Sequence, residues 1–249
     1  MQLSVHSTAL LRYDNLKIFS KGAHIMARRI KLSDRTLPRY SFGEEVMNMV
    51  THIVGGALGI LALILCVGKA ALLRDVPAII GSSIYGVSMV TLYTMSSVYH
   101  GLHPSMGKKV MQIIDHCTIY FLIAGTYTPI LLSAFLPVYP ALGWGLLIFE
   151  WGASALAATL TAIDLKKYNI FSMVCYITTG WAVIPFWRQA MEVLTRPGFL
   201  LLLFGGIAYT IGAVLYGIGS RKKWMHSVFH IFVVLGSLLQ FLSIFFYAL

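Results

Sequence analysis

Apolar residues fill most of the chain in long stretches, which short groups of polar residues, charges or prolines separate. About 20 consecutive apolar residues are enough to cross the hydrocarbon core of a bilayer as a helix. The pattern predicts seven such helices, at 46–71, 77–99, 110–132, 139–162, 170–189, 199–220 and 223–248. The fifth is the least regular, since Pro185 lies inside it. We therefore expect an all-α integral membrane protein built as a seven-helix bundle.

Composition agrees with this pattern and excludes a soluble protein. Hydrophobic residues make up 58% of the chain and charged residues 11%, and the mean hydropathy is +0.78. A soluble domain carries about 25% charged residues. Cys66, Cys117 and Cys175 all lie inside apolar stretches, and their spacing fits no zinc or redox motif. We expect them to be packing residues.

Residues 1–40 differ in character from the remainder of the chain. They hold eight of the 19 lysines and arginines and no apolar core with a cleavage site, so they do not read as a signal peptide. We expect a basic tail that is disordered or lies on anionic lipid. If Met26 is the true start, the first 25 residues are an artefact of the gene assignment. We expect the membrane domain to be residues 41–249 in either case.

The positions of the cations predict the orientation of the helices. If the N-terminus is in the cytoplasm, 15 lysines and arginines face the cytoplasm and four face outward. Cytoplasmic segments of membrane proteins are enriched in these residues, so we expect a cytoplasmic N-terminus and an external C-terminus. The net charge of +10 therefore reflects membrane orientation, and we expect no nucleic-acid partner.

Ionisable and polar residues inside the predicted spans gather at one depth. Four helices bring such residues to their cytoplasmic ends. These residues are Glu44, Glu45, Asn48, His52, His100, Asp115, His116, His226 and His230. Ionisable residues within a membrane are costly and mark functional sites. Glu150 is the exception, since it lies near the middle of the fourth span; we expect it to pair with a Ser, Thr or Tyr or to be protonated.

Spacing within this group suggests a metal site. His226 and His230 are four residues apart and so share one helix face, as do Ser96 and His100. Three histidines with a fourth position left for water describe a catalytic type of zinc site, in which Asp115 would hold the water or orient a histidine. A single histidine at a membrane interface is more often a wetted anchor than a ligand. His116 is rotated about 100° from Asp115 around the helix, so we expect it to point elsewhere.

Four sequence blocks carry a resemblance to a known family. "EEVMNMVTH" (44–52), "SSVYHGLHP" (96–104), "DHCTIYFLIAGTYTP" (115–129) and "HSVFH" (226–230) resemble, in order, the signature blocks of the hemolysin III family. That family is the bacterial branch of the progestin and adipoQ receptor (PAQR) superfamily, and the similarity covers about residues 40–249. It implies a seven-helix bundle with a cytoplasmic N-terminus, in the bacterial inner membrane. It also implies a zinc ion held by His100, His226 and His230, with Ser96 and Asp115 beside it.

Three functions remain open on the sequence. The first is a zinc-dependent hydrolase of a lipid amide or ester, in which Asp115 takes a proton and Ser96 hydrogen-bonds the water or the developing oxyanion. The second is a non-catalytic regulator or sensor of membrane-lipid homeostasis with a structural zinc. The third is a pore-forming cytolysin, which fits less well because lytic toxins are usually exported in soluble form. Membrane lipids are the expected partners in each case.

Overall fold

The computed structural model describes residues 31–219 and 222–249. The chain divides into two compact units, Met1–Arg35 and Thr36–Leu249. Within the first, the described residues include one short 3-10 helix, η1 (Leu32–Asp34). Most of the predicted tail, residues 1–30, lies outside the described residues.

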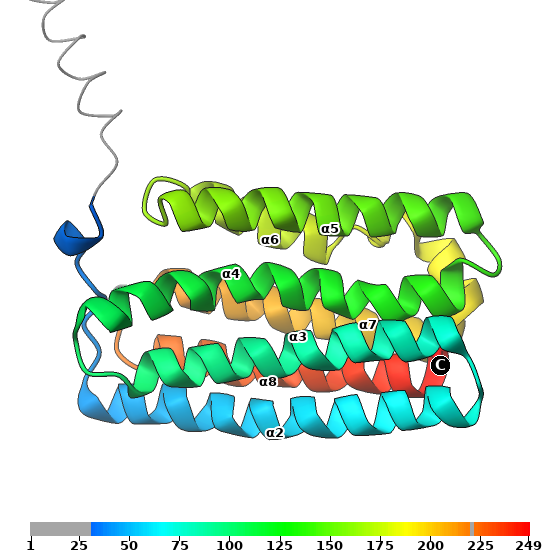
Figure 1. Cartoon of the computed structure of the whole chain (residues 1–249), viewed down its shortest axis with the longest axis horizontal. Coiled ribbons are helices and arrows are strands. Elements are labelled where there is room, and N and C mark those ends of the chain that lie inside the picture. The colour runs from blue at the N-terminus through cyan, green and yellow to red at the C-terminus, as the bar shows by residue number, and fades with distance from the viewer. Residues whose placement is uncertain (1–30, 220–221) are drawn as a thin grey trace, which may run out of the picture. The chain divides into compact units, whose positions relative to one another are not determined.

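The second unit is a bundle of long helices, and no strand occurs among the described residues (Figure 1). Two of its segments, η2 and η4, are π-helical and continue the helices before them, while η3 is a 3-10 turn. The elements are α2 (Phe42–Leu72), α3 (Val76–Gly101), α4 (Met106–Pro129), η2 (Ile130–Phe135), α5 (Pro140–Ile163), α6 (Asn169–Gly180), η3 (Ile184–Phe186), α7 (Trp187–Gly219), α8 (Met225–Ser243) and η4 (Ile244–Ala248).

Six segments of the described chain are long and apolar enough to cross a membrane. Five of them correspond one to one with predicted spans. The sixth, Asn169–Gly219, is 51 residues long and contains the positions predicted as the fifth span and nearly all of the sixth. It is broken at Thr195, whose φ of 61° is not helical, just before Pro197. In Figure 1 the chain turns back near this break, so that α6 and the long part of α7 form separate rods.

Local sequence signals explain where the first three long helices begin. Ser41 caps α2 in a capping box, in which its hydroxyl accepts from the Glu44 backbone and the Glu44 side chain accepts from the Ser41 backbone. Asp75 caps α3, which has Pro77 in its first turn, and Ser105 caps α4. These caps lie in short connections, so consecutive helices run antiparallel and the end of α3 lies near the start of α2.

Small residues let α3 approach both of its neighbours closely. A Cβ added to Gly81 would lie 2.7 Å from the Pro129 Cα on α4, and one added to Gly86 would lie 2.7 Å from the Leu63 Cα on α2. Contacts of this kind replace the hydrophobic effect, which does not drive helices together inside lipid. As a result α3 is fixed between α2 and α4, and the polar residues at its C-terminal end are fixed with it.

We predict that Gly81→Ala destabilises the bundle by about 1–3 kcal/mol, because the added methyl group meets backbone atoms that cannot move aside cheaply. The matched control is Gly145→Ala on α5, where an added Cβ would have no neighbour within 4 Å. Unfolding of the purified proteins by denaturing detergent measures both changes. Equal stability of the two variants would show that the close contact between α3 and α4 is not limiting.

Candidate metal centre

Three histidines converge at the end of the bundle where α3 ends and α8 begins. His100 closes α3, and His226 and His230 lie on successive turns of α8; each is at most 8% exposed. The Nε2 atoms of His226 and His100 are 3.4 Å apart, and those of His230 and His226 are 3.1 Å apart. All three residues offer ligand atoms within 4.8 Å of one another, so the group could hold a metal ion. The structure thus brings together the three histidines that the spacing predicted.

These separations match those between the ligands of a single ion. Two nitrogens bound at 2.0–2.1 Å to a tetrahedral centre lie about 3.3 Å from each other. The observed 3.4 Å and 3.1 Å lie on either side of this value.

Neighbouring groups orient two of the rings so that Nε2 is the free nitrogen. His100 donates from Nδ1 to Glu45 Oε2 at 2.6 Å, a contact much shorter than the 3.4 Å from the same nitrogen to Asn48 Nδ2. His230 donates from Nδ1 to the backbone oxygen of Asn48 at 3.2 Å. A proton held on Nδ1 leaves a lone pair on Nε2, as in metal-binding histidines whose other nitrogen is hydrogen-bonded.

Counting protons shows why a cation suits this group. With Nδ1 protonated, His100 and His230 each present a lone pair toward Nε2 of His226. A proton on that nitrogen of His226 can be donated to only one of the two, which leaves the lone pair of the other without a donor in a buried site. A cation satisfies all three nitrogens at once.

Residues of α2 and α4 complete the polar surroundings of the histidines. Glu45 also accepts from Lys108 Nζ at 2.6 Å, and Lys108 donates further to the Leu102 carbonyl at 2.9 Å. The side-chain oxygen of Asn48 accepts from Ser227 Oγ at 2.6 Å. Glu45 therefore links α3 to α4, and Asn48 links α2 to α8.

The start of α8 is set by one further contact with α2. Trp224, in a left-handed conformation with φ 66°, donates its backbone N–H to Glu44 Oε1 at 2.7 Å. This contact ends the α7–α8 connection directly before His226. The N-terminal ends of α2 and α8 are thereby joined beside the histidines.

Aromatic rings pack against two of the histidines. Tyr40 stacks on His226 with centroids 4.8 Å apart, and His52 stacks on His230 at 3.7 Å with an angle of 17° between the rings. The ring nitrogens of His52 have no hydrogen-bond partner among the described residues. Because its ring is nearly parallel to that of His230, its lone pairs do not converge on the point that His230 faces. Burial and then the neighbouring Tyr216 raise the pKa of Tyr40, which therefore stays uncharged.

Asp115 and Ser96 lie together beside the histidines. Ser96, on α3, is the side-chain hydrogen-bond partner of Asp115, on α4. Both line the same cavity as His226 and His230. The structure thus places the predicted pair at the predicted end of the bundle. The sequence suggested that Asp115 holds a water molecule or orients a histidine. At His100, the carboxylate that orients the ring is that of Glu45.

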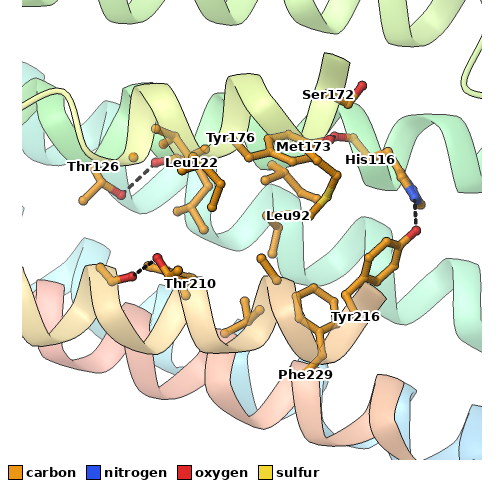
Figure 2. A pocket seen from close by; sticks show the side chains of 18 of the residues that line it. Leu92, His116, Leu122, Thr126, Ser172, Met173, Tyr176, Thr210, Tyr216 and Phe229 are labelled. Carbon is orange, nitrogen blue, oxygen red and sulfur yellow. Dashed lines mark hydrogen bonds between the residues drawn. The ribbon is translucent and has the colours of Figure 1, made fainter. Parts of the chain in front are cut away.

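The cavity extends well beyond the histidines, and most of the side chains along it are apolar. It runs between α3, α4, α6, α7 and α8, from His226 to Gln240. Figure 2 shows Leu92, Leu122, Met173 and Phe229 along its walls. A cavity with ionisable residues beside the histidines and many apolar residues along its length suits an amphiphile.

His116 lines this cavity as well, which corrects the expectation that it points elsewhere. Its Nε2 lies 3.3 Å from the hydroxyl of Tyr216, across the cavity on α7 (Figure 2). The reason is geometric: α4 borders the cavity over a broad face, so side chains about 100° apart both reach it.

The other residues discussed from the sequence lie away from this site. Glu150 is fully buried in α5, and neither carboxyl oxygen has a hydrogen-bond partner among the described residues, so the expected pairing with Ser, Thr or Tyr is not seen. His103 lies in the connection after α3. Cys66 is buried, Cys117 and Cys175 are half-buried, and all three are free thiols.

The fold and the site together define a class: a multi-pass helical membrane protein with a buried group of three histidines that could hold a metal ion. Within that class the chain belongs to the haemolysin-III related family, whose family model matches residues 40–241. It is 37% identical to "Hemolysin-3" of Bacillus cereus over 206 residues, covering 83% of this chain and 92% of that protein. It is 35% identical to "Hemolysin-3 homolog" of Bacillus subtilis (strain 168), covering 84% and 96%. It is 26% identical to the human "Monocyte to macrophage differentiation factor", covering 68% and 77%.

Sequence reasoning placed Glu45 and Asn48 at the right depth but gave them no role. Their partners are 52 to 182 residues away along the chain, so spacing could not reveal them. Lys108 was counted only as a cytoplasmic cation. One signal was available, since Glu45 and Asn48 are three residues apart and share a face of α2.

We predict that Glu45→Gln lowers the affinity of the purified protein for a divalent metal by roughly 10–100-fold, the usual effect of losing a hydrogen-bonded partner of a metal ligand. An uncharged amide neither polarises the His100 N–H as strongly nor neutralises Lys108. Competition with a chelator measures the affinity. Glu192→Gln is the control, because that carboxylate bonds Tyr139 and not a histidine, and the prediction fails if both variants hold metal equally well.

Proposed function

We propose that the protein is a zinc-dependent hydrolase of a lipid amide or ester. The observation that carries this proposal is the cavity that reaches Asp115 and two of the three histidines, His226 and His230. Three neutral histidine nitrogens are the donor set of one type of catalytic zinc site, which leaves a fourth position for water or substrate. Bound zinc would lower the pKa of a water molecule and polarise a carbonyl group.

The residues of this chain then have separate roles. Asp115 lies at the cavity wall and would accept a proton from the attacking water. Ser96 would hold the ionised carboxyl group through its hydrogen bond. Once Asp115 has taken up a proton, the single hydroxyl proton of Ser96 can turn to the oxygen on which negative charge develops. The apolar walls would hold the chain of the lipid and keep bulk water away from the carbonyl group.

We also propose that Asn169–Gly219 crosses the membrane twice, which gives seven spans. As one straight helix its 51 residues would extend about 77 Å, more than twice the thickness of the hydrocarbon core. Seven spans and the cation distribution together support a cytoplasmic N-terminus, with the histidines in the cytoplasmic leaflet and the C-terminus outside. The bacterial relatives support an inner-membrane location. Residues 41–249 would form this domain and residues 1–40 a surface tail.

A structural metal is the second candidate function. Glu45 and Asn48 tie α2, α3, α4 and α8 together around the histidines, and a zinc ion there could act as a staple in a protein that regulates or senses membrane lipids. The name "Hemolysin-3" of the Bacillus cereus relative is the support for a pore-forming cytolysin. This third function is the least favoured, because the helices that build the site are themselves candidate membrane spans.

We predict about one zinc ion per chain in protein purified without chelators, and its loss in His226→Ala combined with His230→Ala, since the triad then keeps only His100. Elemental analysis of the detergent-solubilised protein measures the content. His103→Ala is the matched control, because that histidine lies outside the group. Wild-type protein free of zinc would overturn both the hydrolase and the structural role.

We predict that Asp115→Asn keeps zinc but slows hydrolysis by about 10²–10⁴-fold, the usual contribution of a positioned general base. A strain carrying this variant should accumulate one lipid class that wild-type cells turn over, and lipid analysis of the two strains measures it. An unchanged lipid profile with zinc retained would instead favour the structural role.

A further inference from the structure

The far end of the cavity contains a polar side chain that the proposed chemistry does not use. Gln240 lines the cavity from α8, on the same helix as His226 and His230. Fourteen residues separate His226 from Gln240, which is about four turns of helix, so both side chains lie on one face roughly 21 Å apart along the axis. The metal group and Gln240 therefore mark the two ends of one cavity.

The side-chain amide of Gln240 makes no hydrogen bond with any described residue. Other polar groups at this end are already engaged. The Thr126 hydroxyl donates to the Leu122 carbonyl, and the Thr210 hydroxyl donates to the Gly206 carbonyl (Figure 2). An amide inside a membrane helix is expensive unless something in the bundle bonds to it. Gln240 thus leaves donors and an acceptor facing the space that a ligand would fill.

The backbone of α7 makes room for this side chain. A Cβ added to Gly205 would lie 2.6 Å from Gln240 Cγ, so the glycine is what allows the glutamine to lie against α7. Between the two ends the cavity wall on α8 is apolar, formed by Phe229 and Val233. A bound chain would therefore meet apolar side chains along its length and an amide at its far end.

We propose that Gln240 forms a second polar subsite, which recognises a hydroxyl group near the far end of a long acyl chain whose head group lies at the histidines. An extended chain advances about 1.3 Å per carbon–carbon bond, so roughly sixteen carbons span the distance from His226 to Gln240. The amide can both donate to a hydroxyl group and accept from it. An unsubstituted chain of that length would leave the amide unpaired. The proposal names the substrate class of the proposed hydrolase, and it rests on that function only for the position of the head group.

The test measures binding without turnover, by titration calorimetry of the full-length, metal-containing protein in nanodiscs. The probes are ω-hydroxypalmitic acid, palmitic acid and α-hydroxypalmitic acid, whose hydroxyl group lies beside the head group. Wild-type protein should bind the ω-hydroxy acid about 3–10-fold more tightly than palmitic acid, the contribution of one hydrogen bond. Gln240→Leu should abolish or reverse this preference and leave the affinity for the α-hydroxy acid unchanged.

The matched control is Gln189→Leu, the same chemical change at a residue that does not line the cavity. It should keep the wild-type preference. Equal affinity of wild-type protein for palmitic and ω-hydroxypalmitic acid overturns the proposal, and this comparison needs no variant to fold. A preference that survives in Gln240→Leu also overturns it. Absence of hydrolysis with the binding preference intact would refute the hydrolase and leave this subsite standing.

Discussion

The histidine group depends on one constraint: polar atoms buried at the end of this bundle must find partners within the protein, because bulk water does not reach them. Each histidine alone would be a poorly placed residue in an apolar helix. Together they are arranged so that Glu45 and the backbone of Asn48 take two of the Nδ1 protons and the Nε2 atoms face a common point. The partners come from α2, so the position of α2 against α3 and α8 decides whether the group can exist.

Close packing and open space occur in different parts of the bundle. The three helices α2, α3 and α8 that surround the histidines pack closely, and farther along α3 Gly86 brings it near α2. On the other side, α6 has only 12 residues and packs sparsely against α7, and there the cavity opens. A metal site requires ligands held to within fractions of an ångström, whereas a channel for a flexible chain requires space. The fold separates these demands between two groups of helices.

Sequence reasoning reached the features that depend on one helix or on a shared depth, and it missed the contacts that depend on how two helices pack. The apolar stretch predicted at 77–99 is α3, Val76–Gly101, because hydrophobic length is a property of the stretch itself. The pairing of His226 with His230 followed from the period of the helix. The Glu45–His100 contact and the approach of His116 to Tyr216 join helices by packing angles that no spacing encodes. The break at Thr195 lies in the gap predicted between the spans 170–189 and 199–220, because Arg196 and Pro197 interrupt the apolar residues there.

A single helix, α8, carries the residues at both ends of the cavity. In α8, residues 226, 230, 233 and 240 share one face of the helix. Along this face the two histidines come first, the apolar Val233 follows, and the amide of Gln240 comes last. A helix fixes their separation without any contact between them, because its rise per residue is constant. A loop could not hold a polar group about 21 Å from the histidines with the same precision. Because α8 holds the histidines and Gln240 at a constant separation, it would allow an acyl chain of a particular length to be recognised. The close packing of α8 on α7 at Gly205 and Gly236 keeps α8 in position.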